Sequence, residues 1–359
     1  MKVAIFDPYL DTMSGGERYM LSIALCLQND HQVSILWDKT PEDEIISLAK
    51  KRFSYDLSQC NFVPSFFSPQ IGTFARYKKS KEFDLIIYLS DGSIPVVGCN
   101  LFIHFQSPMP WVKGRSLKNI IKLSRAKKII CNSQFTKKYI DELYGVRSIV
   151  LYPPVSIMEN SEFKKENVVL NVGRFGVNHA GSSYKKQDIM AEVFKKMSDK
   201  NSIKQWKLVL VMSVHDQDME RVEEFKKKYA GLPIDFVINP DNDTLWEYYS
   251  RAKIYWHAAG FGEDIINHPD RAEHFGISTV EAMGAGVVPV VFEAGGQKEI
   301  VKNNENGILW KTNEELENAT IQLMNDANLL SKLSKRAASD AKFFSIDTFC
   351  QNVQTVVQK

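Results

Sequence analysis

The sequence has almost no excess of charge and no long apolar run. Its 45 Lys and Arg residues nearly balance its 43 Asp and Glu residues, and the formal net charge is +2. Bulk attraction to nucleic acid is therefore not indicated. The first apolar run, VAIF at residues 3–6, is too short for the core of a signal peptide. No later run approaches the length of a membrane span.

Closely spaced cysteines are also lacking. The five cysteines are scattered along the chain at positions 26, 60, 99, 131 and 350, and no two of them form a CxxC pair. This pattern supports neither a disulfide framework nor a zinc site. A reducing cytoplasm fits it best, so we expect no disulfide and no metal site.

The chain instead has a regular alternation of short apolar runs and helical patterns. At 359 residues it is long enough for two domains. The apolar runs are mostly continuous, as in parallel strands that are covered on both faces. A first set of expected strands comprises residues 3–6, 32–37, 84–89, 101–105, 128–131 and 148–152. A second set comprises residues 168–172, 207–212, 235–238, 254–257, 287–292 and 307–310.

Helices are expected between these strands, among them residues 17–28, 218–229 and 315–326. Another helix is expected near Thr40, a candidate N-cap, with Pro41 at the first helical position. The fold class is therefore predicted to be α/β, with two Rossmann-like doubly wound sheets that face each other. Ligands bind beyond the carboxyl ends of such strands, in the cleft between the domains. On pattern alone, a single large α/β domain remains the alternative.

Two features in the first half are candidate ligand contacts. SGGER (14–18) opens a helix after the first strand, so Gly16 lets backbone amides approach an anion. The alternative is a tight turn in which Glu17 complements the helix dipole. Because the motif is not GxGxxG, the dinucleotide fingerprint is not met. His104, near a strand end, either contacts a sugar in the cleft or is a satisfied core histidine.

Basic residues flank a loop at the start of the second half. NVGRF (171–175) places Arg174 at a strand end, and the small-residue loop GVNHAGSS (176–183) then leads to Lys185 and Lys186. Arg and Lys held across a loop can clamp a diphosphate. The alternative is ordinary surface charge, which suits Lys186 better than Arg174.

The segment RAEHFGISTVEAMGAG (271–286) carries Glu273 and Glu281, eight positions apart, on either side of a Phe-Gly turn. A helix follows this turn, so the free amides of its first turn point at whatever lies in the cleft and favour an anion. Glu281, about one turn into the helix, can accept hydrogen bonds from vicinal hydroxyls. The alternative is that one glutamate caps the helix and the other is solvated on it.

A basic segment at residues 112–128 contains seven Lys and Arg residues and no acidic residue. Leu117, Ile120 and Ile121 fall at helical spacing on one face, which is typical of an amphipathic helix at a membrane surface. The equally favoured alternative is a packed helix whose apolar stripe belongs to the core and whose basic face is solvated.

Jointly, these motifs resemble the retaining GT-B glycosyltransferases of family 4. EHFGISTVE (273–281) matches that family's E-x7-E pattern, and EAMGAGVVPVV and AGGQKEIV follow it as is usual there. NVGRF with the later KKQD is similar to the family's Arg…Lys diphosphate clamp, with Lys185 as the family lysine. CNSQFTKKYI and LYPPV are also typical, and SGGER resembles the branch of lipid-linked oligosaccharide mannosyltransferases.

The resemblance implies a role for each matching residue. Glu273 would contact the donor sugar and Glu281 the ribose hydroxyls, while Arg174 and Lys185 would hold the diphosphate. His104 would lie near the reacting sugar, and Gly16 near the phosphates or the acceptor. The remaining donor contacts implied are Phe275, Gly276, Ile277 and Ser278.

The resemblance also implies the domain arrangement. Residues 1–155 would form an acceptor-binding domain and residues 156–344 a nucleotide-sugar-binding domain, with a last helix at 345–359 packed back on the first domain. Family members usually carry a short EGFG loop, whereas this chain has a GFGE (260–263) before Glu273. Only Glu273 has the eight-residue separation from Glu281, and the segment 263–271 is a candidate lid.

The function implied is transfer of a hexosyl unit from a nucleotide sugar, with a weak preference for GDP-mannose. The acceptor would be a glycan or lipid-linked molecule in polysaccharide or glycoconjugate synthesis at the cytoplasmic membrane face. No cofactor or metal is expected, because helix amides, Arg174 and Lys185 can stabilise the leaving diphosphate. Asp241-Asn242-Asp243 is interpreted as a helix cap. The alternatives are a non-catalytic sugar-nucleotide-binding subunit and a GT-B epimerase.

Overall fold

The computed structural model describes residues 1–68, 70–158, 163–177, 183–200, 202–203 and 205–358. Its internal contacts divide the chain into two compact units. Unit 1 comprises Met1–Pro154 and Phe344–Lys359, and unit 2 comprises Val155–Phe343. The chain therefore passes from one unit to the other twice, first directly after Pro153-Pro154.

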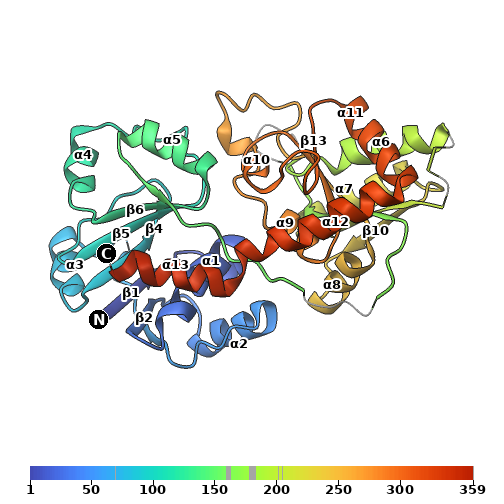
Figure 1. The fold of residues 1–359 in the computed structure, drawn as a ribbon. Helices are drawn as coiled ribbons and strands as arrows, with labels where there is room; N and C mark the ends of the chain where they lie inside the picture. Colours follow the sequence, from blue (N-terminus) through green and yellow to red (C-terminus); the bar gives the residue numbers. More distant parts are fainter. Residues whose placement is uncertain (69, 159–162, 178–182, 201, 204, 359) are drawn as a thin grey trace. The chain divides into compact units, whose positions relative to one another are not determined.

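Unit 1 is built on a parallel sheet (Figure 1). In the described part of the chain, its strand order is β3-β2-β1-β4-β5-β6-β7. Its strands are β1 (Lys2–Phe6), β2 (Gln32–Leu36), β3 (Asn61–Val63), β4 (Leu85–Leu89), β5 (Asn100–Phe105), β6 (Lys128–Cys131) and β7 (Ile149–Val150). Its helices are α1 (Gly15–Leu27), α2 (Glu42–Phe53), α3 (Thr73–Ser80), α4 (Leu117–Leu123), α5 (Gln134–Tyr144) and α13 (Ile346–Gln358), with the 3₁₀ turn η1 (Leu10–Thr12).

Unit 2 has a second parallel sheet, with the order β10-β9-β8-β11-β12-β13 among the described residues. Its strands are β8 (Val168–Arg174), β9 (Lys207–Ser213), β10 (Ile234–Ile238), β11 (Ile254–His257), β12 (Val288–Phe292) and β13 (Ile308–Trp310). Its helices are α6 (Gln187–Asp199), α7 (Met219–Lys228), α8 (Asn242–Arg251), α9 (Ile277–Gly284), α10 (Gln297–Ile300), α11 (Asn313–Asn325) and α12 (Ala327–Ala341). The short turns are η2 (Asp216–Asp218), η3 (Pro269–Arg271) and, at the border of the units, η4 (Lys342–Phe344).

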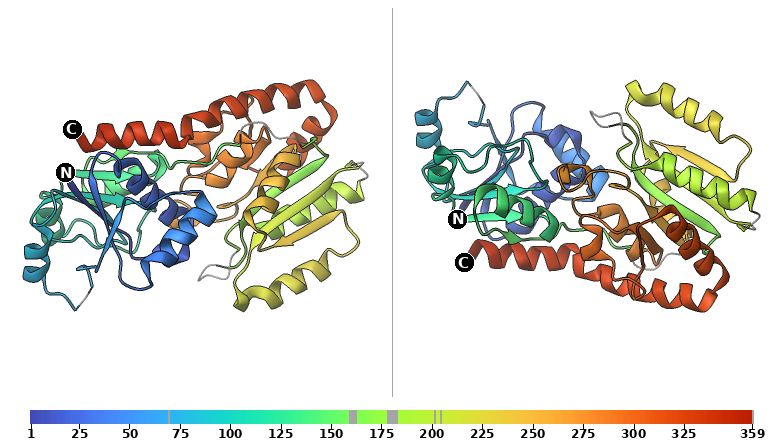
Figure 2. Two further views of the ribbon diagram at one scale, coloured as in Figure 1. Left: turned by 90° about the horizontal axis from the view of Figure 1, so that it is seen from below. Right: turned by 90° about the horizontal axis from the view of Figure 1, so that it is seen from above.

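The predicted fold class is confirmed. Helices lie on both sides of each sheet (Figure 2), so the central strands are covered on both faces. All residues of β4 and of β11 are buried, which is why these strands are continuous apolar runs in the sequence. In each sheet the strand order reverses beside the first strand of the unit: between β1 and β4 in unit 1, and between β8 and β11 in unit 2.

Local predictions about helix starts had mixed outcomes. The Thr40 N-cap is wrong: Pro41 occupies the cap position and helix α2 begins at Glu42, while the Thr40 hydroxyl accepts a hydrogen bond from the Trp37 indole instead. The Asp241 cap is confirmed, since its carboxylate accepts the backbone N–H of Thr244 at 2.9 Å.

Within the described residues, no cluster of His, Cys, Asp or Glu suits a metal ion.

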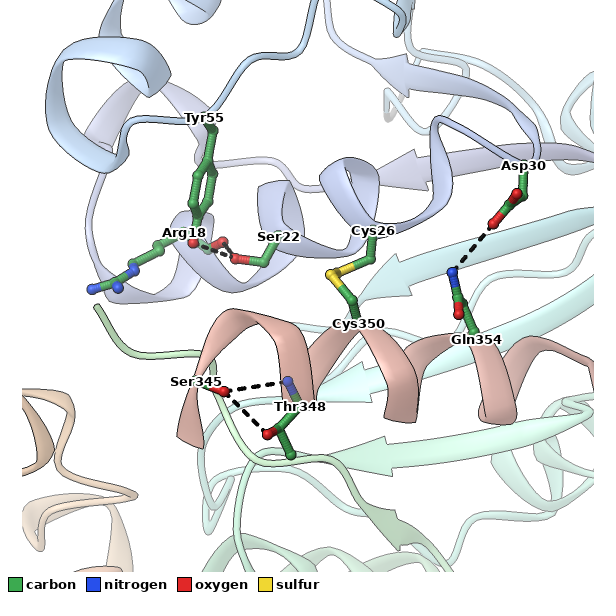
Figure 3. The surroundings of a disulfide bond; sticks show 9 residues. All are labelled: Arg18, Ser22, Cys26, Asp30, Tyr55, Ser345, Thr348, Cys350 and Gln354. Carbon is green, nitrogen blue, oxygen red and sulfur yellow. Dashed lines mark hydrogen bonds between the residues drawn. A yellow bond between two sulfur atoms is a disulfide. The ribbon is translucent and has the colours of Figure 1, made fainter. Parts of the chain in front are cut away.

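The expectation of no disulfide is wrong. Cys26 near the end of α1 is bonded to Cys350 in α13, 324 positions away (Figure 3). Helix α13 packs against α1, and Phe349, Val353 and Val357 are buried in the core of unit 1. Scattered cysteines conceal such a pair, because only the return of the last helix brings the two residues together. The bond also removes the support that the cysteine pattern lent to a reducing compartment.

Losing this disulfide should lower the stability of unit 1. A bond that closes so long a loop restricts the unfolded chain, and its removal typically costs about 2–4 kcal/mol. We expect dithiothreitol to lower the melting temperature of the wild type but not that of Cys350→Ser. In denaturant, the titratable thiols should rise from the three of Cys60, Cys99 and Cys131 to all five on reduction. Five thiols without reductant would contradict the assignment, and Cys99→Ser is the control that keeps the dithiothreitol response.

The basic segment 112–128 contains the short helix α4 (Leu117–Leu123), but its apolar stripe is not part of the core. Leu117, Ile120 and Ile121 are 74%, 50% and 56% exposed, and Trp111 nearby is 64% exposed. Only Leu123 at the helix end is buried. The packed-helix alternative is therefore wrong for this stripe, and we call Trp111, Leu117, Ile120 and Ile121 the α4 surface.

Candidate active site

The carboxyl ends of β8 and β11 are the starting point for the site in unit 2. These strands are hydrogen-bonded neighbours at the place where the strand order reverses. Doubly wound sheets bind ligands outside the carboxyl ends of the strands at such a point. Arg174 is the last residue of β8 and His257 the last residue of β11, so both lie at this edge.

Glu273 lies at this edge between two basic side chains. Its Oε2 atom is 2.5 Å from the Nζ atom of Lys185 and 2.9 Å from the Nε2 atom of His257. The side chain of Glu273 is 15% exposed and that of His257 only 2%. Three residues that are far apart in the sequence thus form one largely buried cluster.

The surroundings shift the pKa values of both Glu273 and His257 in this cluster. Burial alone would raise the pKa of Glu273, but the Lys185 ammonium and the His257 hydrogen bond outweigh it and hold that pKa well below its usual value. Burial lowers the pKa of His257, although its contact with Glu273 opposes this effect. At neutral pH the cluster therefore contains an ionised carboxylate and an uncharged imidazole.

The turn after Glu273 depends on glycine. Gly276 has a φ of 121°, a left-handed conformation that other residues rarely adopt, and it directly precedes α9. Gly295 and Gly296 pack so closely on this turn that a Cβ atom would lie 2.1 Å from the Glu273 carbonyl oxygen or 2.5 Å from the Phe275 Cα atom. These glycines fix the path of the chain from Glu273 into the helix.

Helix α9 then presents its first turn and Glu281. Ile277 and Ser278 are partly exposed, and the amides of a first helical turn have no partner within the helix. One turn later, the Glu281 carboxylate accepts a hydrogen bond at 3.0 Å from the hydroxyl of Tyr249, in α8. The predicted donor contacts from Phe275 to Ser278 thus follow each other along the start of one helix, with Phe275 itself buried.

A half-buried lysine contacts the ends of helices α8 and α9 behind this site. The Nζ atom of Lys165 donates to the carbonyl oxygens of Ala252 at 2.8 Å and Ala285 at 2.7 Å, one at the end of each helix. Burial lowers the pKa of Lys165 to about 8. A cation at a helix C-terminus interacts favourably with the helix dipole, so one side chain stabilises both helix ends.

Arg174 and Lys185 lie on either side of the small-residue loop. The Arg174 guanidinium lies over the Tyr184 ring, 4.5 Å from its centroid, and the residue is otherwise exposed. The stem of Lys185 packs against Gly173, where a Cβ atom would be 3.0 Å from Cγ of the lysine. Residues 178–182 of GVNHAGSS lie outside the described part of the chain.

The interpretation of Lys186 as ordinary surface charge is wrong. Its side chain is 9% exposed, and its Nζ atom lies 2.5 Å from Oε1 of Glu263, whose side chain is 7% exposed. The other carboxylate oxygen of Glu263 is 3.1 Å from Nη1 of Arg271. Glu263 and Arg271 are the two ends of the candidate lid segment, so this buried cluster connects the base of the segment to the start of α6.

In unit 1, SGGER forms the start of α1. The Glu17 carboxylate accepts hydrogen bonds from the Ser14 backbone N–H at 2.7 Å and from the Thr12 hydroxyl at 2.8 Å. The Gly16 carbonyl accepts the Gln106 amide at 3.0 Å, and a Cβ atom on Gly16 would clash with that same side chain. The structure therefore explains both residues by local packing, and the ligand role of Gly16 stays a prediction.

His104 lies in β5 with no exposed surface. Its ring stacks on that of Tyr19 with centroids 4.1 Å apart, and the Tyr19 hydroxyl donates to the Leu151 carbonyl. Neither ring nitrogen has a hydrogen-bond partner among the described residues. Burial lowers the pKa of His104 to about 3, so the ring is uncharged at neutral pH. Its catalytic role also stays a prediction, because this structure leaves no route for a ligand to touch the ring.

The stability of the protein should fall in acid because His104 is buried and uncharged. Below pH 6.5 the unfolded chain binds a proton at this residue, whereas the folded protein does not until about pH 3. Stability is therefore lost as the pH falls through this window, by about 1.4 kcal/mol per pH unit. His104→Phe keeps the stacking but has no group to protonate. Between pH 6.5 and 5, its free energy of unfolding should therefore fall by about 2 kcal/mol less than that of the wild type. Urea unfolding at several pH values measures this; His215→Phe, at an exposed histidine, is the control. Parallel pH curves for wild type and His104→Phe would contradict the assignment.

The structure thus brings Arg174, Lys185, Glu273, Glu281 and the start of α9 to one edge of one sheet. Sequence reasoning missed two residues that support them, namely His257, which contacts Glu273, and Tyr249, which contacts Glu281. A polar residue closing an otherwise apolar strand, as in IYWH (254–257), is the signal by which His257 could have been found.

Comparison with known proteins identifies the family of this chain. The family model described as glycosyl transferases group 1 matches residues 156–340, which are 185 of the 359 residues. The chain is 23% identical to "GDP-Man:Man(3)GlcNAc(2)-PP-Dol alpha-1,2-mannosyltransferase" of Dictyostelium discoideum, over 97% of this chain and 83% of that protein. The human protein of the same description is 24% identical, over 64% of this chain and 48% of its own length.

Solved structures share the fold over the whole chain. The HepE protein of Anabaena in complex with UDP has a TM-score of 0.72 at 17% identity, with all of both chains covered. A glycosyltransferase from Rickettsia africae has a TM-score of 0.73 at 15% identity, over 99% of this chain and 97% of that one. A sucrose-phosphate synthase from Thermosynechococcus elongatus has a TM-score of 0.69 at 16% identity, over 100% of this chain and 98% of that one.

These likenesses establish the GT-B fold, and the family match covers more than half of the sequence. The protein is therefore a glycosyltransferase that belongs to the family of glycosyl transferases group 1.

Proposed function

We propose that the protein is a retaining hexosyltransferase that uses a nucleotide-diphosphate sugar. The observation that supports this most directly is the ionised Glu273 carboxylate, held between Lys185 and His257 beside the start of α9. A carboxylate there can accept hydrogen bonds from sugar hydroxyls, while the adjacent helix amides and Lys185 attract the diphosphate. Glu281, fixed by Tyr249, is the proposed contact for the ribose hydroxyls.

The proposed reaction breaks the bond between the anomeric carbon and the diphosphate oxygen. Negative charge develops on the leaving diphosphate, and Arg174, Lys185 and the amides of Ile277 and Ser278 stabilise it. The acceptor hydroxyl attacks the same face of the sugar, and its proton passes to an oxygen of the leaving phosphate. We assign no protein nucleophile and no metal to this step. Unit 1 is proposed to bind the acceptor, with Gly16 near the phosphates or the acceptor.

The donor is proposed to be GDP-mannose and the acceptor a lipid-linked glycan. The relatives described as mannosyltransferases use GDP-mannose and a PP-Dol-linked acceptor, according to their descriptions. For several of them, the match covers only part of this chain and less than half of the relative's own length. HepE, with the same fold, was crystallised with UDP and glucose, so the fold alone does not choose the base. SGGER and the relatives' descriptions together favour guanine and mannose.

A thermal-shift screen tests the donor, because a ligand at 100 times its dissociation constant stabilises a protein by about 2.7 kcal/mol. GDP-mannose should raise the melting temperature more than UDP-, dTDP- or ADP-sugars do. Transfer of labelled mannose to a lipid-diphosphate oligosaccharide, with the α configuration kept, should follow. Donor binding without transfer or hydrolysis would instead favour a regulatory subunit. Conversion of the donor into another sugar nucleotide would favour an epimerase.

The α4 surface is proposed to bind the membrane that carries the acceptor. Its four exposed apolar side chains lie among Lys113, Lys118 and Arg125, which are exposed as well. Lys122 differs, since its Nζ atom donates to the Ile94 carbonyl at 2.6 Å. Within the described residues, no helix is long and apolar enough to span a bilayer. Contact at the membrane's cytoplasmic face is part of this proposal.

Reversing charge on this surface should weaken vesicle binding. Each Lys or Arg near an anionic surface contributes about 1 kcal/mol, so Lys118→Glu with Arg125→Glu should lower affinity by about 30-fold or more. Sedimentation with phosphatidylserine vesicles measures this, and Lys332→Glu with Lys335→Glu on α12 is the charge-matched control. Equal losses for both pairs would mean that only net charge matters, and no loss for either would remove the membrane proposal.

A further inference from the structure

Two polar side chains of β11 support the two ends of the donor segment. Tyr255 and His257 are two residues apart, so they point to the same face of the sheet. The Tyr255 hydroxyl lies 2.8 Å from the Ser278 hydroxyl, at the start of α9. His257 contacts Glu273 at the other end of the same segment.

Within the donor segment, His257 contacts the side chain of Glu273. Its Nε2 atom contacts the Glu273 carboxylate, and its Nδ1 atom has no partner among the described residues. Because the carboxylate is an acceptor only, Nε2 must carry the proton of the neutral ring. The other titratable groups near this pair are Lys185, which contacts Glu273, and Asp270 and His274, which precede and follow Glu273 in the chain.

We propose that His257 is a positioning residue: its Nε2–H group holds the Glu273 carboxylate ionised and aimed at the donor sugar. Lys185 is free to exchange part of its contact with Glu273 for the diphosphate, since an ammonium has three donors. His257 is buried and has no second hydrogen-bond partner in the described part of the chain, so it keeps Glu273 in place when the donor binds. The proposal rests on the proposed function and assigns a task to a residue outside the family motif.

The matching task of Tyr255 is to hold the start of α9 through Ser278. Its hydroxyl also lies 3.3 Å from the carbonyl oxygen of Val172, two residues before the end of β8. The same strand therefore supports sugar recognition through His257 and diphosphate recognition through Tyr255. This division predicts a different kinetic effect for each residue.

Kinetics of three variants test the division. His257→Phe keeps a ring but loses the donor, and we expect kcat to fall about 10- to 100-fold with donor KM nearly unchanged. His257→Gln retains an N–H group that reaches the carboxylate and should recover most of this loss. Tyr255→Phe should raise the donor KM more than it lowers kcat. Equal losses for His257→Phe and His257→Gln, or the same kinetic change in Tyr255→Phe and His257→Phe, would overturn the proposal.

Nuclear magnetic resonance tests the contact whether or not transfer is observed. In the wild type labelled with ¹⁵N-histidine, the His257 signal, assigned by its loss in His257→Gln, should show a neutral ring protonated at Nε2. In protein labelled with ¹³C-glutamate, the Glu273 carboxyl signal, assigned with Glu273→Gln, should titrate at higher pH in His257→Phe than in the wild type. A charged or Nδ1-protonated ring, or an unchanged Glu273 titration, would overturn the proposal. If no donor reacts with the wild type while these signals behave as expected, the proposed function fails and the contact stands.

Discussion

Glu273→Gln is expected to lower kcat by on the order of 100-fold while donor affinity changes little. The amide keeps the size of the side chain but loses the charge that Lys185 and His257 hold in place. A charge that acts mainly on the developing positive sugar contributes to the transition state rather than to the ground state. Transfer rates at saturating donor, together with donor binding by calorimetry, measure the two quantities separately.

Glu281→Ala is the comparison that gives this result its meaning. We expect it to weaken nucleotide binding about 10- to 100-fold, because a hydrogen bond to a charged group is lost. The buried Tyr249 hydroxyl also loses its carboxylate partner. If the effects are exchanged between the variants, the sugar and the ribose lie at the opposite ends of the segment. Wild-type transfer and hydrolysis in both variants would remove the site assignment altogether.

Glu263→Gln is expected to destabilise unit 2 by about 3–5 kcal/mol. Removing one charge from a buried ion cluster weakens the compensation of the remaining charges, here Lys186 and Arg271. Lys186 also has a left-handed backbone with a φ of 57°, which a lysine adopts only when its surroundings hold it there. Because Lys185 directly precedes Lys186, we also expect the donor KM to rise. Urea unfolding and donor kinetics measure the two effects.

Glu293→Gln is a matched control for this experiment. Glu293 also lies between two cations of unit 2, Lys298 at 3.8 Å and Lys311 at 3.5 Å, but these lysines are 56% and 66% exposed. Exposed pairs contribute about 0–1 kcal/mol, so this variant should unfold nearly like the wild type. In a double-mutant cycle, Lys186→Met should recover part of the stability lost in Glu263→Gln. Equal, small losses for Glu263→Gln and Glu293→Gln would show that burial does not strengthen the first cluster.

The role of the segment 263–271 follows from the same cluster. The sequence placed a candidate lid between Glu263 and Arg271, and the structure ties both ends of that segment together and to Lys186. Movement of the whole segment would break buried ion pairs, whereas its tip carries Ile266 with 83% of its surface exposed. Whether the tip moves when the donor binds stays a prediction for the Glu263→Gln variant to test.

Much of the fold could be predicted because its signals are local. Continuous apolar runs such as DLIIYL (84–89) and VVPVVF (287–292) exist because both faces of the central strands are covered. The glycine turn at Gly276 was visible because only glycine takes its backbone conformation readily. The E-x7-E spacing of Glu273 and Glu281 was likewise contained in nine consecutive residues.

Other features could not be read locally, and the errors show why. Thr40 is a residue type that is common at helix N-caps, but its hydroxyl accepts a hydrogen bond from the Trp37 indole. Lys186 is a residue type that usually lies at the surface, but here it is buried in the cluster with Glu263 and Arg271. The stripe of Leu117, Ile120 and Ile121 has the spacing of a core face, yet no described part of unit 1 covers it. In each case the partner, or the lack of cover, is decided by elements elsewhere in the chain.

The sequence by itself therefore determined the α/β architecture and the family, and it predicted the residues that would contact a donor, since each of these rests on local periodicity or a short motif. Only the tertiary structure decided the pairing of Cys26 with Cys350, the burial of Lys186 and the contact of His257 with Glu273. These depend on which strands and helices become neighbours, and that is set by packing over separations of 16 to 324 residues.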